Sequence, residues 1–456
     1  MAGRPPLTGP ADFAGRTVLV YGTGLAGRTA TRALLDLGAR VLVADDGSRP
    51  PVLPTGADFA GPLTGLPAGV DAVVPSPGLP PSHPVLAQAA VAGIEVLSEI
   101  ELAWRLQPPG GPRWLMVTGT NGKTTTVRML ESVLRAAGLR ALAVGNVGVP
   151  VIEAVLAEPG YDVLAVEASS FQLHFTRLLR PHAGALLNLA EDHLDWHGSM
   201  GAYARAKTAV WNGEHRIGNA DDPLVAELLA EHGGNRLEFG LAAPAPGRLG
   251  LADGQLVDAA GRPLLPAGEV RPAGPHNVAN ALAAAALAGT LGLGPEPIAA
   301  GLRDFVPDPH RNQLVAERAG IRYVDDSKAT NPHAAAASLA AYPRVVWIAG
   351  GQLKGADIEP LVAEHAGRLA GAVLLGVDRA AIAAALSRHA PDLPVIEVSR
   401  ADDGVMEEIV AAATSLAAAG DVVLLAPAAA SKDMFASYGA RGLAFQDAVR
   451  ALPGPA

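Results

Sequence analysis

The stretch Met116-Val-Thr-Gly-Thr-Asn-Gly-Lys-Thr-Thr-Thr126 decides the fold of this chain and most of its predicted chemistry. It follows an apolar run at residues 114–117 and opens a segment whose apolar residues recur with helical spacing until Gly138. A strand, a glycine-containing loop and a helix N-terminus form an anion site, because backbone N–H groups and the helix dipole point at one spot. The stretch therefore predicts a nucleoside triphosphate site.

The side chains of this loop support the same interpretation. Lys123 adds a mobile positive charge, and Thr124 offers a hydroxyl where a phosphate-bound Mg²⁺ needs an oxygen ligand. Only two residues separate Gly119 from Gly122, where the common phosphate loop has four, so this is a shorter variant. The alternative is a glycine turn that only caps a helix, but the coincidence of Gly, Lys and Thr favours a nucleotide. The predicted ATP-binding residues of the loop are Gly119, Thr120, Asn121, Gly122, Lys123, Thr124 and Thr125.

Composition narrows the class of protein. At 456 residues the chain is too long for one compact core, and its lack of cysteine excludes disulfides and thiolate metal sites. We find no signal segment and no apolar run of about 18 residues, so we expect a cytoplasmic protein without a membrane partner. The net charge of −10 argues against binding to nucleic acid or to a membrane surface. Phosphate binding must then depend on a few cations and Mg²⁺ held in clefts.

Short apolar strands alternate with helical segments along the whole chain, which predicts an α/β fold with parallel sheets. Turn-rich sequence near residues 98–112 and 306–309 indicates two boundaries. We therefore expect three domains, at residues 1–98, 99–308 and 309–456. Strands are expected at residues 17–21, 40–44, 70–74, 94–97, 163–166, 185–189, 321–324, 345–348, 372–375 and 422–425.

A second glycine motif, Gly22-Thr-Gly24-Leu-Ala-Gly27, lies between a strand and a helix. Asp45 ends the next strand, where an acid that binds a ribose belongs. Three interpretations stay open: an NAD-dependent dehydrogenase, a turn that lets helix and strand pack closely, and a site for the diphosphate of another nucleotide. Ser76-Pro-Gly78 would add a further loop at the same sheet edge.

Several polar residues follow predicted strands in the middle third of the chain. Glu167 is placed to hold Mg²⁺, although a solvated carboxylate is the simpler alternative. His193 lies in an acid-rich loop and could ligate metal through a neutral imidazole, whereas Asp195 and His197 are equally well explained as solvated. Lys207 lies on a predicted helix, and its spacing alone predicts a surface charge.

The last third carries three similar loops. Lys328, in Asp325-Asp326-Ser-Lys328-Ala-Thr330-Asn331, could bridge phosphate and carboxylate, or the loop could simply cap a helix. His310-Arg311, Gly350-Gly-Gln-Leu-Lys354 and Ser431-Lys432-Asp433 also follow strands or boundaries. Each places a cation or hydroxyl where an open sheet binds ligands.

Together these motifs resemble the Mur ligase family over nearly the whole chain, in order and with matching spacing. No single motif is specific, but the set is. Further motifs that carry the resemblance are Gly145-Asn146-Val-Gly148, Asn188 to His197, Asn219 to Asp222, Gly274-Pro-His-Asn277-Val-Ala-Asn280 and Ala430 to Gly442.

The resemblance implies an ATP-dependent amide ligase of peptidoglycan synthesis, and so of cell-wall biogenesis, cell shape and cell division. Its fold would be an N-terminal Rossmann-like UDP-binding domain, a central P-loop ATPase domain and a C-terminal Rossmann-like domain. Its partners would be the small molecules UDP-N-acetylmuramoyl-L-alanine, D-glutamate and ATP, with two Mg²⁺ ions, and the chain would act as a monomer. The carboxylate would react through an acyl phosphate, and the domains would close before chemistry.

The resemblance also assigns roles to residues, and for Lys207 it replaces the surface charge with a carbamylated lysine. Lys123, Glu167, His193 and Lys207 would be catalytic, and Thr124, Glu167, His193 and Lys207 would hold metal. Leu25, Ala26, Asp45, Gly78, Asn146 and His193 would bind the UDP-substrate. Asn280, Arg311, Asp326 and Lys328 would contact ATP, and Thr330, Lys354, Ser431 and Tyr438 would hold glutamate.

The sequence departs from the family pattern at Lys432-Asp-Met434, at Tyr438 and at Asn312-Gln313, which bears on the identity and stereochemistry of the amino acid. Three rival functions remain at this point. A folate-polyglutamate ligase would not need the first glycine motif, and a dehydrogenase would leave the loop around Lys123 without a role. A non-catalytic nucleotide sensor would bind ATP without releasing phosphate.

Overall fold

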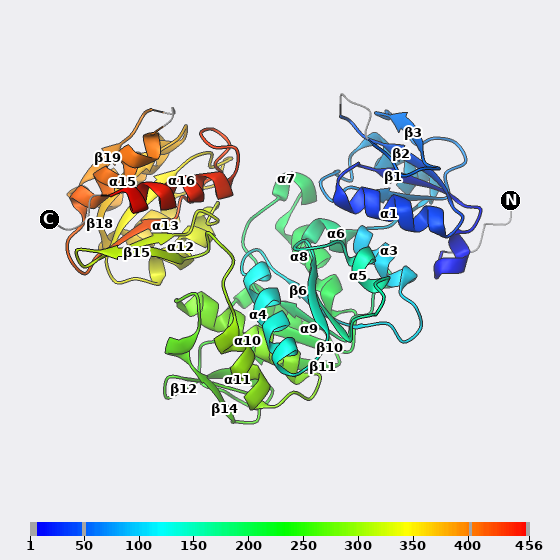
Figure 1. Ribbon diagram of the computed structural model, residues 1–456, viewed down its shortest axis with the longest axis horizontal. Helices are drawn as coiled ribbons and strands as arrows, with labels where there is room; N and C mark the ends of the chain where they lie inside the picture. Colours follow the sequence, from blue (N-terminus) through cyan, green and yellow to red (C-terminus); the bar gives the residue numbers. More distant parts are fainter. Residues whose placement is uncertain (1–6, 48–51, 401–403, 453–456) are drawn as a thin grey trace. The chain divides into compact units, whose positions relative to one another are not determined.

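The computed structural model describes residues 7–47, 52–400 and 404–452, and the chain divides into two compact units (Figure 1). The first unit runs to Ala267 and includes Ala279–Phe305, and the second holds Gly268–Val278 and the chain from Val306 onward. Three separate sheets are present in the described residues, two in the first unit and one in the second. Within the same residues, no helix combines the length and apolar character needed to cross a membrane.

The first sheet has the order β3-β2-β1-β4-β5, and all its strands are parallel. The central strand is buried because Val18, Leu19 and Val20 face helices or neighbouring strands on both sides. The strands are β1 (Thr17–Tyr21), β2 (Arg40–Ala44), β3 (Asp58–Gly61), β4 (Ala72–Pro75) and β5 (Glu95–Val96); the helices are α1 (Leu25–Asp36) and α2 (Pro84–Ala92), after a short 3₁₀ turn at Pro10–Phe13.

The second sheet has nine strands in the order β14-β13-β12-β11-β10-β9-β6-β8-β7. Pairing is parallel from β7 to β12, and the last two strands add an antiparallel edge. The strands are β6 (Arg113–Thr118), β7 (Ala141–Gly145), β8 (Val163–Glu167), β9 (Ala183–Leu186), β10 (His215–Asn219), β11 (Asn235–Phe239), β12 (Arg248–Ala252), β13 (Gln255–Val257) and β14 (Pro263–Pro266). The helices are α4 (Lys123–Ala136), α5 (Val151–Val155), α6 (Ser170–His174), α7 (Leu194–His197), α8 (Met200–Thr208), α9 (Pro223–Glu231), α10 (Pro275–Gly289) and α11 (Pro295–Asp304), with 3₁₀ turns at Ala209–Trp211 and Ala267–Glu269.

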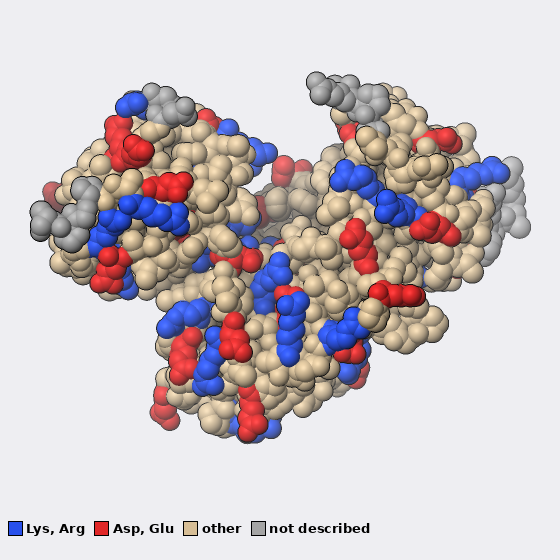
Figure 2. All heavy atoms as spheres, in the orientation of Figure 1, with Lys and Arg blue, Asp and Glu red and all other residues tan. Residues whose placement is uncertain are grey.

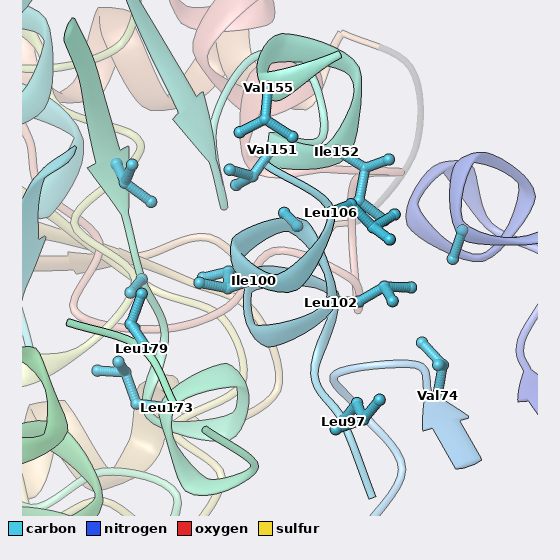
Figure 3. Close-up of a cluster of buried hydrophobic side chains, with 14 of the residues drawn as sticks. Val74, Leu97, Ile100, Leu102, Leu106, Val151, Ile152, Val155, Leu173 and Leu179 are labelled. Carbon is cyan, nitrogen blue, oxygen red and sulfur yellow. The ribbon is translucent and has the colours of Figure 1, made fainter. Parts of the chain in front are cut away.

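Helix α3 (Glu99–Leu106) joins the first two sheets through one continuous apolar core (Figure 3). Its side chains contact residues of both sheets because apolar positions occur around most of its circumference. The residues of this junction labelled in Figure 3 are Val74, Leu97, Ile100, Leu102, Leu106, Val151, Ile152, Val155, Leu173 and Leu179. This shared core explains why the two sheets belong to one compact unit.

The third sheet lies in the second unit and has the order β15-β16-β20-β17-β18-β19. It is parallel except for the antiparallel edge strand β15. Its strands are β15 (Gln313–Arg318), β16 (Ile321–Asp325), β17 (Val345–Gly350), β18 (Leu369–Leu375), β19 (Val395–Glu397) and β20 (Val422–Leu425). Its helices are α12 (Pro332–Ala340), α13 (Glu359–His365), α14 (Arg379–His389), α15 (Val405–Leu416) and α16 (Tyr438–Ala451), with a 3₁₀ turn at Ala366–Arg368.

The predicted α/β class with parallel sheets is confirmed, and every predicted strand overlaps an observed one. The strands β3, β7, β10 to β15 and β19 were not predicted. Two of them, β13 and β19, have only three residues, which is too few for a clear alternation. The predicted domain limits at residues 98 and 308 stay predictions. On the face that Figure 2 shows, Lys and Arg side chains are interspersed with Asp and Glu.

Candidate active site

The phosphate-loop prediction falls between β6 and α4, where two glycines take conformations that suit no other residue. Gly119 has φ 157° and Gly122 has φ 84°, and a Cβ on Gly122 would collide with the amide of Asn280. Asn188 holds the loop from the next strand: its Oδ1 accepts from the Asn121 N–H at 2.8 Å, and its Nδ2 donates to the Asn121 carbonyl at 3.0 Å. The loop is therefore held rigidly at the carboxyl edge of the sheet.

Lys123 folds back over this loop. Its Nζ donates to the carbonyl oxygens of Gly119 at 2.9 Å and Thr120 at 2.8 Å. The ammonium group thus lies above the turn, at the N-terminus of α4, where a helix favours an anion. The arrangement provides a full positive charge beside the backbone N–H groups of the loop.

Glu167 ends β8 beside the loop and is almost fully buried, so the solvated-carboxylate alternative is wrong. Its Oε2 accepts from the Thr124 hydroxyl at 2.8 Å, and its Oε1 accepts from the Asn146 amide at 2.9 Å. A buried carboxylate next to a hydroxyl is a set of hard oxygen donors, which suits Mg²⁺. These residues fit a magnesium ion, and Asn146 belongs to the same cluster.

Lys207 is buried rather than exposed, so the surface-charge interpretation is wrong. It lies on α8 with 2% of its surface accessible, and its Nζ donates to the Gly119 carbonyl at 2.8 Å. Burial, reinforced by the nearby charge of Lys123, holds the pKa of Lys207 well below its ordinary value. The two lysines share one carbonyl acceptor, so a neutral amine at Lys207 relieves their repulsion.

His193 lies in a ring cluster next to this site. It has φ 54°, its Nε2 is 3.5 Å from a carboxylate oxygen of Asp192, and its ring packs 4.6 Å from that of Phe171. Burial lowers the pKa of His193, which favours the neutral imidazole that a metal needs. His197 hydrogen-bonds the Ser170 hydroxyl at 2.9 Å, and burial lowers its pKa to about 4. His197 is therefore part of a packed cluster and not a solvated side chain.

The first glycine motif forms a strand–turn–helix between β1 and α1. A Cβ on Gly27 would collide with the carbonyl of Gly22, so this glycine permits the close approach of helix and turn. Asp45 accepts from the Thr23 N–H at 2.7 Å and from the Thr23 hydroxyl at 2.6 Å. These bonds, with one from the Gly47 N–H, lower the pKa of Asp45.

Leu25, Ala26 and Gly78 lie at this same edge of the first sheet, whereas Asn146 and His193 lie beside the second sheet. Leu25 and Ala26 open α1, and Leu25 is half exposed. Gly78 follows β4, and the Ser76 N–H donates to the Tyr21 carbonyl at 2.6 Å, which brings this turn against the first glycine loop. The carboxyl ends of β1, β2 and β4 thus converge, as the alternation of strands and helices predicted.

In the second unit, the predicted residues follow three neighbouring strands, β16, β20 and β17. The Gln352 N–H donates to the Ala430 carbonyl at 2.8 Å, so the loop of Lys354 pairs with the loop of Ser431. Lys328 Nζ lies 4.1 Å from the ring centre of Tyr438, which begins α16. Thr330 is two residues from Lys328, and its N–H donates to the Lys328 carbonyl.

Asp326, directly after β16, is partly buried. It accepts hydrogen bonds from the Ser338 hydroxyl and from the Asn312 N–H, and burial raises its pKa to about 6. Arg311 is paired with Asp308, its Nε lying 3.9 Å from the carboxylate. The predicted residues that follow β16, β17 and β20 therefore gather at one edge of the sheet. Arg311 lies just before the edge strand β15 and pairs with Asp308.

Three residues were not singled out by the sequence. The Tyr203 hydroxyl lies 2.9 Å from the Thr120 hydroxyl, and its ring lies beneath Lys207 at 4.7 Å. The spacing of four between Tyr203 and Lys207 on one helix was the available signal. Asn188 was quoted only as part of a motif. Arg441 is buried and donates to the Ala429 and Ser327 carbonyls, and nothing in its local sequence distinguishes it from a surface arginine.

The chain is similar to known proteins along nearly its whole length. Residues 117–288 match the family model for the Mur ligase middle domain, and residues 310–429 match that for the Mur ligase, glutamate ligase domain. The chain is 55% identical to the UDP-N-acetylmuramoylalanine–D-glutamate ligase of Thermobifida fusca, covering 97% of this chain and 100% of that protein. It is 49% identical to the ligase of the same name from Streptomyces avermitilis, covering 97% and 99%.

Solved structures share the fold at low identity. UDP-N-acetylmuramate-alanine ligase from Thermotoga maritima superposes with a TM-score of 0.58 at 17% identity, covering 96% of this chain and 100% of that one. The MurF ligase of Thermotoga maritima, solved with ADP, gives a TM-score of 0.56 at 18% identity, covering 97% and 98%. These structures confirm the arrangement of sheets and helices.

Proposed function

This chain belongs to the Mur ligase family, and from its close relatives we infer that it is a UDP-N-acetylmuramoylalanine–D-glutamate ligase, an enzyme of peptidoglycan synthesis. Its substrates are then small molecules. We propose UDP-N-acetylmuramoyl-L-alanine, D-glutamate and ATP. We also propose that the chain acts as a monomer and works in the cytoplasm.

The proposed reaction makes an amide from a carboxylate. Direct attack by an amine would have to expel oxide, so the carboxylate must first be given a better leaving group. The alanyl carboxylate attacks the γ-phosphorus of ATP, which gives an acyl phosphate and ADP. The amino group of glutamate then adds to the acyl carbon. The tetrahedral intermediate collapses to the amide, with loss of inorganic phosphate and of the amine proton.

The phosphate loop supplies the charge that this phosphoryl transfer needs. Lys123 would neutralise the negative charge that builds up on the transferred group, together with the N–H groups around Gly122. Thr124, Glu167 and His193 would hold Mg²⁺, which supplies a Lewis acid when bound. Glu167 is already oriented for this by its bonds to Thr124 and Asn146.

Lys207 has a chemical reason to be carbamylated. A carbamate forms when the lone pair of a neutral amine attacks CO₂, with loss of one proton to solvent. The depressed pKa of Lys207 supplies the neutral amine, and a carbamate would place beside Lys123 an anion that attracts its ammonium group. We propose that this carbamate completes the metal site.

The remaining loops would bind the other parts of the substrates. The first glycine loop offers N–H groups without a lysine, which suits the diphosphate of the UDP-sugar. The residues that would contact this substrate are Leu25, Ala26, Asp45, Gly78 and Asn146. Asn280, Arg311, Asp326 and Lys328 would contact ATP. Thr330, Lys354, Ser431 and Tyr438 would hold glutamate. We take the three domains to follow the limits at residues 98 and 308.

The observation that carries the proposal is the meeting of Lys123, Lys207, Thr124 and Glu167 around one glycine loop. The test is phosphate release by purified protein supplied with ATP, Mg²⁺ and UDP-N-acetylmuramoyl-L-alanine. We expect release with D-glutamate and little with L-glutamate or with no amino acid. Phosphate release that does not depend on the UDP-sugar would contradict the proposal, and equal rates with both enantiomers would contradict the stereochemistry.

A further inference from the structure

Two histidines and a glutamate meet at the amino edge of the nine-stranded sheet, opposite the edge that carries the phosphate loop. His182 directly precedes β9, and Glu214 and His215 lie at the start of the neighbouring strand β10. One ligand atom from each side chain lies within 4.8 Å of the other two. The proposed ligase reaction uses none of these residues, so their convergence needs its own explanation.

The backbone sets the three side chains in place. The Glu214 N–H donates to the Pro181 carbonyl at 3.2 Å, and the His215 N–H donates to the His182 carbonyl at 3.1 Å. A Cβ on Gly213 would overlap the Pro181 carbonyl, so only glycine allows the two chains to approach this closely. The group is therefore organised before any ligand binds.

Each histidine faces a different oxygen of the Glu214 carboxylate, at a distance like that between neighbouring ligands of a tetrahedral ion. His182 Nδ1 is 3.3 Å from Glu214 Oε2, and His215 Nε2 is 3.4 Å from Glu214 Oε1. Ligands at about 2.0–2.1 Å from a tetrahedral Zn²⁺ are separated by about 3.3–3.4 Å. Two imidazoles and one carboxylate are also a ligand set that catalytic-type zinc sites use, with water in the fourth position.

The tautomer of His182 supports a cation at this point. Its Nε2 lies 3.1 Å from the Thr290 carbonyl oxygen, which can only accept, so Nε2 carries the hydrogen. In the neutral ring, Nδ1 then has a lone pair that faces the Glu214 carboxylate. Two such atoms repel unless a cation lies between them. A histidine whose second nitrogen donates to a backbone carbonyl is the usual form of a metal ligand.

We propose that His182, Glu214 and His215 bind a divalent transition-metal ion of the Zn²⁺ type. Imidazole nitrogens favour such ions over Mg²⁺, which prefers oxygen. About a fifth of each histidine side chain and 61% of that of Glu214 are exposed, so an ion can reach the group from solvent. The ion would connect the starts of β9 and β10 and, through Thr290, the chain just after α10, so it would stabilise the first unit.

The test is a titration of tag-free, full-length protein with Co²⁺ in the presence of excess Mg²⁺. We expect one equivalent of Co²⁺ with the intense visible absorption of a tetrahedral or five-coordinate ion, displaced by Zn²⁺. Zn²⁺ should also raise the melting temperature. Glu214→Gln, at a largely exposed position, should weaken Co²⁺ binding by more than about tenfold and leave ligase activity unchanged. His182→Gln and His215→Gln should do the same to binding.

His232→Gln is the matched control, because His232 belongs to the same unit and is also partly buried, but it caps α9 and its Nδ1 faces the Leu228 carbonyl. It should bind Co²⁺ as the unmodified protein does. Absence of a specific Co²⁺ spectrum in the unmodified protein would overturn the proposal, leaving a protonated histidine as the cation beside Glu214. A spectrum that survives Glu214→Gln and His182→Gln would also overturn it.

Discussion

The two glycine loops of the first unit share a sequence pattern and differ in their chemistry. Each follows a parallel strand and leads into a helix, at Gly22–Gly27 and at Gly119–Thr125. In the first loop a carboxylate, Asp45, accepts the N–H and hydroxyl of Thr23. In the second, the Lys123 ammonium and the Lys207 amine meet over one carbonyl. These differences support the proposal that the first loop holds a nucleotide and the second transfers a phosphoryl group.

We infer from this difference that the glycine pattern specifies a turn, whereas residues from other elements specify the chemistry of that turn. Asp45 comes from the adjacent strand of the first loop, and Glu167 and Lys207 come from β8 and α8 beside the second. Substitutions in the first loop and substitutions in the second should therefore produce different kinetic effects. Changes at the second loop should lower kcat, and changes at the first should raise KM for the UDP-sugar.

The largest effect is expected for Lys123→Ala. Removal of the charge that faces the transferred phosphate should lower kcat by about 10³-fold or more. Calorimetric binding of the UDP-sugar should be unchanged, because the first loop is untouched. Arg28→Ala, in the helix after the first loop, is the control and should keep kcat. A loss of less than about tenfold in kcat for Lys123→Ala would contradict the proposed difference between the two loops.

Lys207→Ala should lower kcat by about 10²-fold to 10³-fold, since the proposed metal site loses one ligand. Formate or acetate should restore part of the activity by occupying the vacated space. Lys207→Arg, which keeps a side chain there but cannot form a carbamate, should not be rescued. ¹³C NMR of unmodified protein in labelled bicarbonate should show a carbamate signal. Failure of every small carboxylate to rescue Lys207→Ala would count against this role.

Two glycine substitutions in the first loop, Gly27→Ala and Gly24→Ala, distinguish an effect on packing from an effect on substrate binding. The Cβ of alanine at position 27 would collide with the Gly22 carbonyl, so we expect a loss of about 1–3 kcal/mol in the free energy of unfolding. At position 24, φ is −64° and nothing lies within 4 Å of the added Cβ. Gly24→Ala should therefore keep its stability and raise only KM for the UDP-sugar. Denaturant unfolding and steady-state kinetics check both, and equal stabilities would contradict the packing argument.

The smallest effect is expected for Asp45→Asn. The substitution removes about 1 kcal/mol of charge-assisted hydrogen bonding, so KM for the UDP-sugar should rise roughly fivefold while kcat stays unchanged. The pKa of Asp45 is lowered on folding, so its ionised form contributes stability above its unfolded pKa of ~3.9. That contribution disappears as the pH falls through the folded pKa. Thermal melts of both proteins should therefore differ at neutral pH and converge in acid; an unchanged difference would contradict the assignment.

Local sequence was sufficient for features that involve neighbours along the chain. The alternation of strands and helices, both glycine turns and the position of Glu167 at a strand end are all properties of short segments, and each is observed. Parallel strands carry their loops to a common edge, so the clustering of Asp326, Lys354 and Ser431 could also be expected. Here the periodicity of the sequence and the geometry of the sheet lead to the same result.

Other features depend on which segments pack together. The spacing around Lys207 predicts a surface helix, yet α8 turns this residue toward Gly119, and burial changes its charge. His182 and Glu214 are 32 positions apart, and only the pairing of β9 with β10 brings them into contact. The shared core around α3 likewise makes one unit from two sheets.

The amino-acid sequence by itself determined the α/β class and the two glycine turns, because these follow from local backbone preferences and strand order. The tertiary structure alone decided that Lys207 is buried, that Glu167 contacts Thr124, and that three metal-ligand side chains meet at the far edge of the sheet. Burial and distance set charge and reactivity, and both arise only when segments distant in the chain pack against one another.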